Sequence, residues 1–325
     1  MLYGRIPHIS STSFRCIESP VICGRSMAEG QIVAGLLAPH PPHLVYAENP
    51  PQNEPTSEGG WEQLRWGYER LRKSLEDVDY DCIVILSPHW QTYVGTHFLG
   101  LERFESLSVD PIFPNLFRFK YDVTVDVELS KAIHDQAKDD GLAVKMMENQ
   151  DFRIDYGTIT SCHMIRPEWD KPIVSISSNR GHAYYSVEVM QEMMIQLGKA
   201  TRKAILESGK KCVIVASNSL SHRHFTTESE VPEDMSVEHI SSHAMHLWDM
   251  RMIELMRSGK SQQIVNEMPE FVEQAIAESD GGALTWMLSA LDMPDEPAIL
   301  HGYGTIIGTG NAIMEWPSRN WGENS

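Results

Sequence analysis

Short apolar runs alternate with segments of helical periodicity along most of this chain. Four runs have the length of a strand, are rich in apolar and β-branched residues, and are bounded by turn-forming residues: 32–38, 82–87, 172–178 and 212–217. Because their apolar character is continuous, we expect burial on both faces, as in the interior of a parallel sheet. A fifth segment, 304–310, is rich in glycine and is predicted to be a late strand or an edge strand.

The segments between these runs carry apolar residues at helical spacing: 60–78, 125–141, 186–211, 241–260 and 268–291. Strands that alternate with helices form βαβ crossovers. The predicted fold is therefore α/β, a single domain in which helices flank a central, largely parallel or mixed sheet. Residues 100–125 show neither periodicity and are predicted to be an insertion or a loop excursion.

The first 26 residues differ from the rest of the chain. They are nearly free of acidic residues, show no apolar periodicity, and lack the continuous apolar core of a secretory signal. Pro7 and Pro20 interrupt the helix that a transit peptide needs. We expect residues 1–26 to be a disordered or misassigned extension, and Met27 to begin a catalytic domain that covers 27–325.

Composition narrows the classes of partner. The 325 residues include 27 basic and 45 acidic side chains, a formal net charge of −18, which repels nucleic acid and anionic membrane surfaces. No apolar run approaches the roughly 18 residues that span a bilayer. The five cysteines are scattered and form no CxxC pair, which favours a reducing, cytoplasmic location.

Three of the 14 histidines follow predicted strands. His40 and His89 each come directly after a proline at the end of a strand, and His222 follows the strand 212–217. In open α/β sheets, functional sites gather outside the carboxyl ends of the strands. Proline fixes the backbone before the first two imidazoles and would orient them rigidly, as a metal ligand requires. The alternative is that these are packing histidines in rigid turns.

The other histidines near these strands have weaker claims. His43 is separated from the first strand-end histidine by two prolines, so the pair cannot share a helical face, and we expect His43 to support or pack against the site. His224 has the same status beside His222: alternation along an extended segment would place both on one side, so either could be the inward residue. His239, His243 and His246 share one helical face and could hold zinc, but we expect that face to be solvated or packed.

The sequence alone leaves the acidic partner open. Two neutral histidines and one carboxylate form the facial triad that holds ferrous iron with free positions. Glu278 is attractive because it lies where a predicted helix meets a Gly-Gly break, but spacing does not distinguish it from Asp249, Glu273 or Asp280. The same donor set would also suit tetrahedral zinc in a hydrolase.

Five stretches resemble a known family: IVAGLLAPHPPHLVYAENPPQNEP, ILSPHW, YGTITSCHMIRPEWD, VIVASNSLSHRHF and GYGTIIGTGNAIMEW. They look like the class III (LigB-type) extradiol ring-cleavage dioxygenases, over about residues 27–317. The resemblance implies that Fe(II) is bound by His40, His89 and Glu278. It also implies that His222 is the acid–base residue.

The resemblance further implies a substrate contact at Tyr156 and a substrate with two neighbouring donor groups on an aromatic ring, cleaved with O2. The expected substrate is 2-aminophenol or a substituted 2-aminophenol; a catechol such as protocatechuate is the alternative. A carboxylated substrate would call for a basic residue, and Arg153, Arg180 and Arg223 are candidates. Because the family often pairs two related chains, we expect an α-type subunit as partner, and an α2β2 assembly would fit. A regulatory, non-catalytic chain would not need the complete set of site residues found here.

Overall fold

The computed structural model describes residues 29–318, apart from 47–59, 112–113, 115–116, 180–184, 224–241 and 307, and apart from the side chains of residues 43, 46 and 60. The predicted extension, 1–26, lies outside these residues, as do His224, His239 and Arg180. No helix among the described residues has the length and apolarity that crossing a membrane requires.

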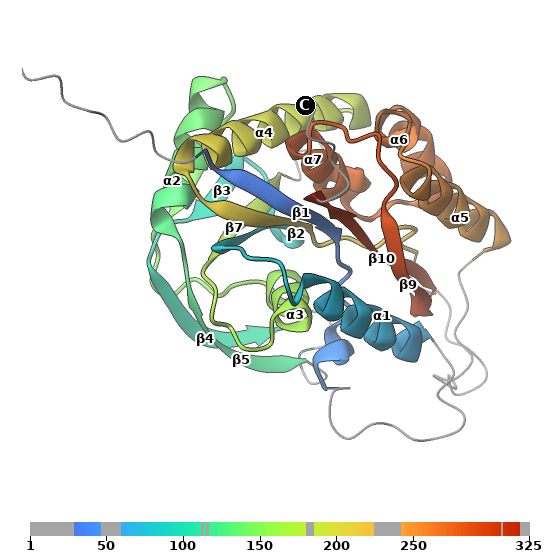
Figure 1. Ribbon diagram of the computed structural model, residues 1–325, viewed down its shortest axis with the longest axis horizontal. Coiled ribbons are helices and arrows are strands. Elements are labelled where there is room, and N and C mark those ends of the chain that lie inside the picture. The colour runs from blue at the N-terminus through green and yellow to red at the C-terminus, as the bar shows by residue number, and fades with distance from the viewer. Residues whose placement is uncertain are drawn as a thin grey trace, which may run out of the picture.

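Strands and helices follow one another along the chain (Figure 1). The strands are β1 (Gln31–Leu37), β2 (Cys82–Thr92), β3 (Thr96–Leu99), β4 (Arg103–Val109), β5 (Arg118–Thr124), β6 (Val144–Met147), β7 (Ile173–Asn179), β8 (Lys211–Ala216), β9 (Ile299–Ile306) and β10 (Thr309–Pro317). The helices are η1 (Pro42–Tyr46), α1 (Gly60–Leu75), α2 (Val127–Asp139), α3 (Tyr156–Ile165), α4 (Val187–Ser208), α5 (His243–Arg257), α6 (Ser261–Ala275), η3 (Glu278–Gly281) and α7 (Gly282–Ala290).

Eight of these strands form one mixed sheet in the order β6-β3-β7-β2-β8-β1-β10-β9. Its centre is parallel, because β2 pairs parallel with β7 and β8, and β8 pairs parallel with β1. Antiparallel pairs join β1 to β10 and β10 to β9. The predicted single α/β domain with a mixed central sheet is confirmed.

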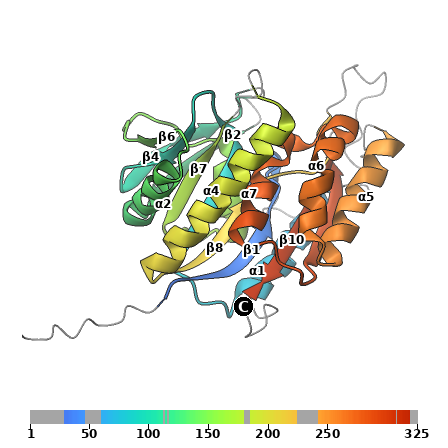
Figure 2. The same ribbon diagram turned by 90° about the horizontal axis from the view of Figure 1, so that it is seen from above.

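The central strands are buried on both faces. In β2, Cys82, Val84 and Leu86 pack into one core, whereas Ile83 and Ile85 pack into the core on the opposite face. Helices α2, α4 and α7 lie over the first face, and α1 and α3 lie over the other (Figures 1 and 2). The continuous apolar runs therefore reflect a sheet enclosed between two helical layers.

Two predicted elements are wrong because the chain bends within them. The expected helix 268–291 is divided: α6 ends at Ala275, and α7 begins only after the η3 turn that carries Glu278. The expected strand 304–310 contains the turn between β9 and β10, where Gly308 has φ = 82°. Residues with positive φ, in the left-handed region, end both regular elements. Helical or strand periodicity in the sequence does not reveal such residues.

Other elements were missed. Residues 100–125, expected to be irregular, contain the antiparallel pair β4–β5, whose residues are partly exposed. The short strand β6 forms one edge of the sheet, and the short strand β3 lies between β6 and β7. Helix α3 escaped prediction because nine of its ten residues are buried, so it has no polar face to produce a helical period.

Candidate metal centre

His40 lies beyond the end of β1, as predicted. Hydrogen bonding from the Ala38 N–H to the Ala216 carbonyl (3.0 Å) continues the β1–β8 pairing past the last residue of β1. The Tyr68 hydroxyl on α1 donates to the Pro39 carbonyl. The imidazole that follows is 6% exposed. The backbone before His40 is therefore held from both the sheet and a helix.

His89 lies within β2, not beyond its end as predicted. Ser87 pairs with Ser177 and Gln91 with Ser178, so residues 88–90 form a bulge. Pro88 cannot donate to the ladder, which favours a bulge here. The bulge directs the histidine out of the strand, and the His89 N–H donates to the Ser87 hydroxyl oxygen at 3.2 Å.

The first turn of α3 lies against this bulge. Asp155 caps the helix by accepting from the Thr158 N–H, and it also accepts a 2.5 Å hydrogen bond from the Ser87 hydroxyl. A Cβ on Gly157 would lie 2.5 Å from Ser87 Oγ and 3.2 Å from His89 Cδ2. The absence of a side chain at this glycine therefore allows α3 to approach the histidine.

Glu278 is presented by an unusual turn. Ile276, Ser279, Asp280 and Gly281 all have φ between 49° and 66°, the left-handed region that non-glycine residues seldom occupy. The turn is held to the segment after β8, because the Glu278 N–H donates to the Leu220 carbonyl at 3.1 Å. Backbone strain of this kind concentrates at functional sites.

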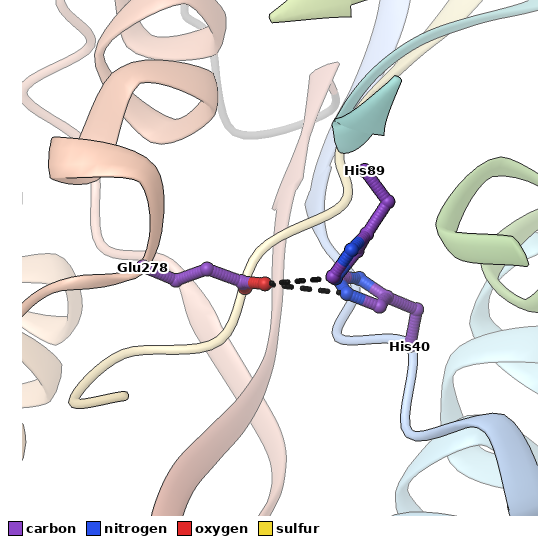
Figure 3. Close-up of side chains that lie close together, drawn as sticks. All are labelled: His40, His89 and Glu278. Atoms are coloured by element: carbon purple, nitrogen blue, oxygen red, sulfur yellow. Dashed lines mark ion pairs between the residues drawn. The ribbon is translucent and has the colours of Figure 1, made fainter. Parts of the chain in front are cut away.

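His40, His89 and Glu278 converge at one point, from three different parts of the chain (Figure 3). Glu278 Oε1 lies 3.3 Å from His40 Nε2 and 3.4 Å from His89 Nε2. Two ligand atoms bound to one ion at about 2.1 Å, with angles of about 90–110°, would lie about 3.0–3.4 Å apart. The observed spacing matches that expectation.

The two carboxylate oxygens of Glu278 have different surroundings. Oε2 accepts from the Ser219 N–H (2.5 Å) and hydroxyl (2.9 Å) and from Asn218 Nδ2 (3.4 Å). Oε1 is buried and, among the described residues, has no hydrogen-bond partner. A buried carboxylate oxygen without a donor is costly unless a cation faces it.

The ionisation of the Glu278 carboxyl depends on the positive charge that faces it. Burial raises the pKa of this carboxyl, but positive charge on the His40 and His222 imidazoles outweighs burial and holds the pKa well below its usual range. Protonated imidazoles or a bound cation would supply that charge equally well. The centre is thus suited to an ionised carboxylate that faces positive charge.

The hydrogen bonds behind His40 select its tautomer. Ser161 donates its hydroxyl proton to the Ala38 carbonyl (2.8 Å). Ser217 Oγ lies 3.2 Å from the Gly157 carbonyl, 2.9 Å from Ser161 Oγ and 2.8 Å from His40 Nδ1. Since both of its other neighbours act as acceptors, the single Ser217 proton goes to one of them, and Ser217 Oγ accepts from the His40 Nδ1–H. The Nε2 lone pair of His40 then faces Glu278 Oε1, and a metal ion between these two acceptors would relieve their repulsion.

Two further predicted residues border this centre. His222 Nε2 lies 3.7 Å from Glu278 Oε1, and its side chain is 29% exposed, more than either of the other two histidines. The Tyr156 hydroxyl lies 2.9 Å from His89 Nε2. Burial raises the pKa of Tyr156, so this hydroxyl keeps its proton at neutral pH. The arrangement places one accessible imidazole and one neutral hydroxyl beside three atoms that could bind a metal ion.

The remaining candidates lie apart from this cluster. Among the described residues, only one group of three or more possible ligands converges, and it includes none of the competing acids or the α5 histidines. Asp249 bonds instead to Ser221, and His246 lies 3.4 Å from the Tyr303 hydroxyl. Arg153 and Arg223 are exposed. The side chain of His43 lies outside the described residues.

The supporting residues Ser217, Asn218 and Ser219 were not anticipated from the sequence. They form a run of three small polar residues directly after the buried strand β8 and are themselves almost fully buried. Such a run at the carboxyl end of a parallel strand is a signal that could have indicated support for a site.

Comparisons with known proteins identify the family of this chain. Residues 34–312 match the family described as "Catalytic LigB subunit of aromatic ring-opening dioxygenase". The chain is 58% identical over 290 residues to the 2-aminophenol 1,6-dioxygenase beta subunit of Pseudomonas sp, covering 89% of this chain and 95% of the relative. It is 26% identical to the alpha subunit of that name, also from Pseudomonas sp, covering 79% and 91% of the two chains.

Two further comparisons give lower identities. The 3,4-dihydroxyphenylacetate 2,3-dioxygenase of Escherichia coli is 23% identical, with 77% of this chain and 87% of the relative covered. The crystal structure of an uncharacterized protein from Escherichia coli K12 matches with a TM-score of 0.60 at 15% identity, covering 87% of this chain and 99% of the other. The family match and the high-identity relative together show that this chain belongs to the LigB family of aromatic ring-opening dioxygenases.

Proposed function

We propose that this protein is the catalytic β chain of an Fe(II)-dependent extradiol dioxygenase. Its substrate is 2-aminophenol or a substituted 2-aminophenol, which it cleaves with O2 to 2-aminomuconate 6-semialdehyde. The observation that carries the proposal is the convergence of His40, His89 and Glu278 in a chain 58% identical to a 2-aminophenol 1,6-dioxygenase beta subunit. The predicted catalytic domain, 27–325, contains all of these residues.

The donor set favours this chemistry. Two neutral imidazoles and one carboxylate are the donors that non-haem Fe(II) oxygenases use, and they leave other coordination positions open. Bound Fe(II) would supply those positions to the two neighbouring donor atoms of the ring and to dioxygen, and would provide a path for electrons between them. The buried carboxylate balances part of the metal charge, and Ser217 and Ser219 orient His40 and Glu278.

His222 is the proposed acid–base residue. In its neutral form, the imidazole would accept the proton of the substrate hydroxyl and would later return a proton to the developing product, a role that suits histidine because its ordinary pKa lies near neutral pH. Its partial exposure allows that proton to exchange with solvent. Tyr156, which keeps its proton at neutral pH, would donate a hydrogen bond to the substrate or to an oxygen atom beside the ring.

A second chain is part of the proposal. The beta subunit and the alpha subunit of 2-aminophenol 1,6-dioxygenase both match this chain in sequence, so the two kinds of subunit are related to each other. We therefore expect an α-type partner, in an α2β2 assembly.

The test measures the iron content of the protein and its uptake of oxygen. The protein is co-expressed with its α-type subunit, loaded anaerobically with Fe(II), and compared with Glu278→Ala and with Glu273→Ala, an exposed acid on α6 that serves as the matched control. We expect about one iron per β chain in the wild type and the control, and 2-aminophenol-dependent oxygen uptake in both. Glu278→Ala should lose the iron.

Three outcomes would contradict parts of this function. Iron that survives Glu278→Ala would remove this residue from the ligand set. Oxygen uptake with protocatechuate or 3,4-dihydroxyphenylacetate, but not with 2-aminophenol, would replace the substrate. Zinc in place of iron, with no oxygen uptake after iron loading, would instead favour the hydrolase that the donor set also permits.

A further inference from the structure

Asp249 is a buried carboxylate that the proposed function does not use. It lies on α5 and is 0% exposed. It accepts three hydrogen bonds: the Ser221 N–H donates to Oδ1 at 2.8 Å, and the hydroxyls of Ser221 and Tyr303 donate to Oδ2 at 2.9 and 2.8 Å. Since burying an ionised carboxylate is costly, its presence calls for a specific reason.

Its partner Ser221 immediately precedes His222. The segment after β8 has left the sheet. Isolated bridges join Ser221 to Ala277 and His222 to Thr309, and the His222 N–H donates to the Ile276 carbonyl at 3.0 Å. These bridges fix the segment against the loop that carries Glu278 and against the start of β10. Asp249 provides the third support, from helix α5.

The neighbouring strand is shaped to admit this carboxylate. Gly310 in β10 exchanges backbone hydrogen bonds with the same segment: the Leu220 N–H donates to the Gly310 carbonyl (2.8 Å), and the Gly310 N–H donates to the Ser221 carbonyl (2.9 Å). A Cβ on Gly310 would overlap Asp249 Oδ2. The carboxylate therefore occupies a space that this glycine leaves open.

We propose that Asp249 is a positioning residue for His222: through the Ser221 backbone it holds the imidazole at the metal centre. This inference rests on the proposed function, in which His222 transfers protons. Proton transfer is sensitive to displacements well below 1 Å, so the loss of one support is expected to slow catalysis without removing the metal ligands. Tyr303 and His246 extend the same network towards the start of α5.

The test uses the iron-loaded complex with the α-type subunit and 2-aminophenol as substrate. We expect Asp249→Ala to lower kcat at least tenfold, while iron content and the KM for 2-aminophenol stay within twofold of wild type. Glu267→Gln is the matched control, because it removes the ion pair (2.7 Å) between Glu267 on α6 and Arg251 on α5, the helix that carries Asp249, without touching the segment before His222. It should keep kcat within twofold.

A double-mutant cycle then separates positioning from general structural support. If Asp249 acts through His222, adding Asp249→Ala to His222→Ala should change single-turnover rates less than twofold. An equal loss in both backgrounds would overturn the inference, as would a wild-type kcat in Asp249→Ala. If Asp249→Ala does not fold, Asp249→Asn decides: one amide oxygen cannot accept from all three donors, so we expect at least a threefold loss of kcat, and a wild-type value would overturn the inference.

Failure of the proposed function would be visible separately. It would appear as absent oxygen uptake in the wild type, or as a normal kcat in His222→Ala alone. Either result would also overturn the inference about Asp249, because no proton transfer by His222 would remain to be positioned.

Discussion

Replacing Ser217 with alanine tests whether the hydrogen bond behind His40 sets metal affinity. The Ser217 hydroxyl is fully buried and lies 2.8 Å from His40 Nδ1. Without it, the Nδ1–H of the metal-binding tautomer loses its acceptor. A buried donor left without a partner costs about 1–3 kcal/mol.

That cost falls mainly on the metal-bound state. In the metal-free variant, His40 can move its proton to Nε2, where Glu278 Oε1 lies 3.3 Å away and can accept it. Metal binding requires the Nε2 lone pair, so it returns the proton to Nδ1, where no acceptor remains. A difference of about 1–3 kcal/mol corresponds to a loss of about 5- to 150-fold in metal affinity.

The assay is an anaerobic titration of metal-free protein with Fe(II) against a competing chelator. Ser130→Ala is the control, because Ser130 is equally buried but lies on α2, where its hydroxyl donates to the Leu99 carbonyl. We expect Ser217→Ala to bind Fe(II) at least fivefold more weakly and Ser130→Ala to bind as the wild type does. An Fe(II) affinity of Ser217→Ala within twofold of wild type would refute either the tautomer assignment or the role of His40 as a ligand.

Three further substitutions test the surroundings of the site. Burial raises the pKa of Asp249 from 3.8 to about 6, so the folded state favours its protonated form; the stability present below about pH 4 is lost as pH rises through 6, by about 3 kcal/mol. Asp249→Asn removes this titration, so the Tm of the variant minus that of the wild type should be higher at pH 8 than at pH 4, and equal Tm differences in calorimetry at both pH values would contradict this. Gly157→Ala should leave less than half the wild-type iron after dialysis, because the new Cβ would lie 2.5 Å from Ser87 Oγ and 3.2 Å from His89 Cδ2; full iron retention would show that the bulge adapts. Tyr156→Phe should raise the KM for 2-aminophenol several-fold while the protein keeps its iron. Unchanged steady-state kinetics would show that this hydroxyl does not contact the substrate.

The strand-end histidines could be anticipated because the governing physics is local. A buried apolar run followed by proline and histidine specifies both where a strand stops pairing and where the next side chain is directed. Even so, His89 emerged inside β2, since a bulge lets a strand continue after it has released three residues. Sequence periodicity does not distinguish a strand that ends from one that bulges.

The carboxylate could not be chosen from spacing, because its position depends on a left-handed turn. Periodicity predicted one helix over 268–291, whereas the residues around Glu278 adopt positive φ. That conformation is held by contacts with the segment 217–222, more than 50 residues earlier in the chain. The role of the polar run Ser217–Ser219 could not be predicted for the same reason, because it depends on the tertiary contact that places Glu278 beside it.

The pairing of β1 with β10 has a consequence for how the protein is synthesised. Ala34 pairs with Pro317, so β1 is synthesised more than 250 residues before the strand that completes its pairing. Until β10 leaves the ribosome, one edge of β1 lacks its partner, and Glu278, also a late residue, is not yet available to the two histidines. Under the proposed function, iron loading would therefore follow the synthesis of Glu278, and a nascent chain stalled before residue 309 would expose a central strand to aggregation.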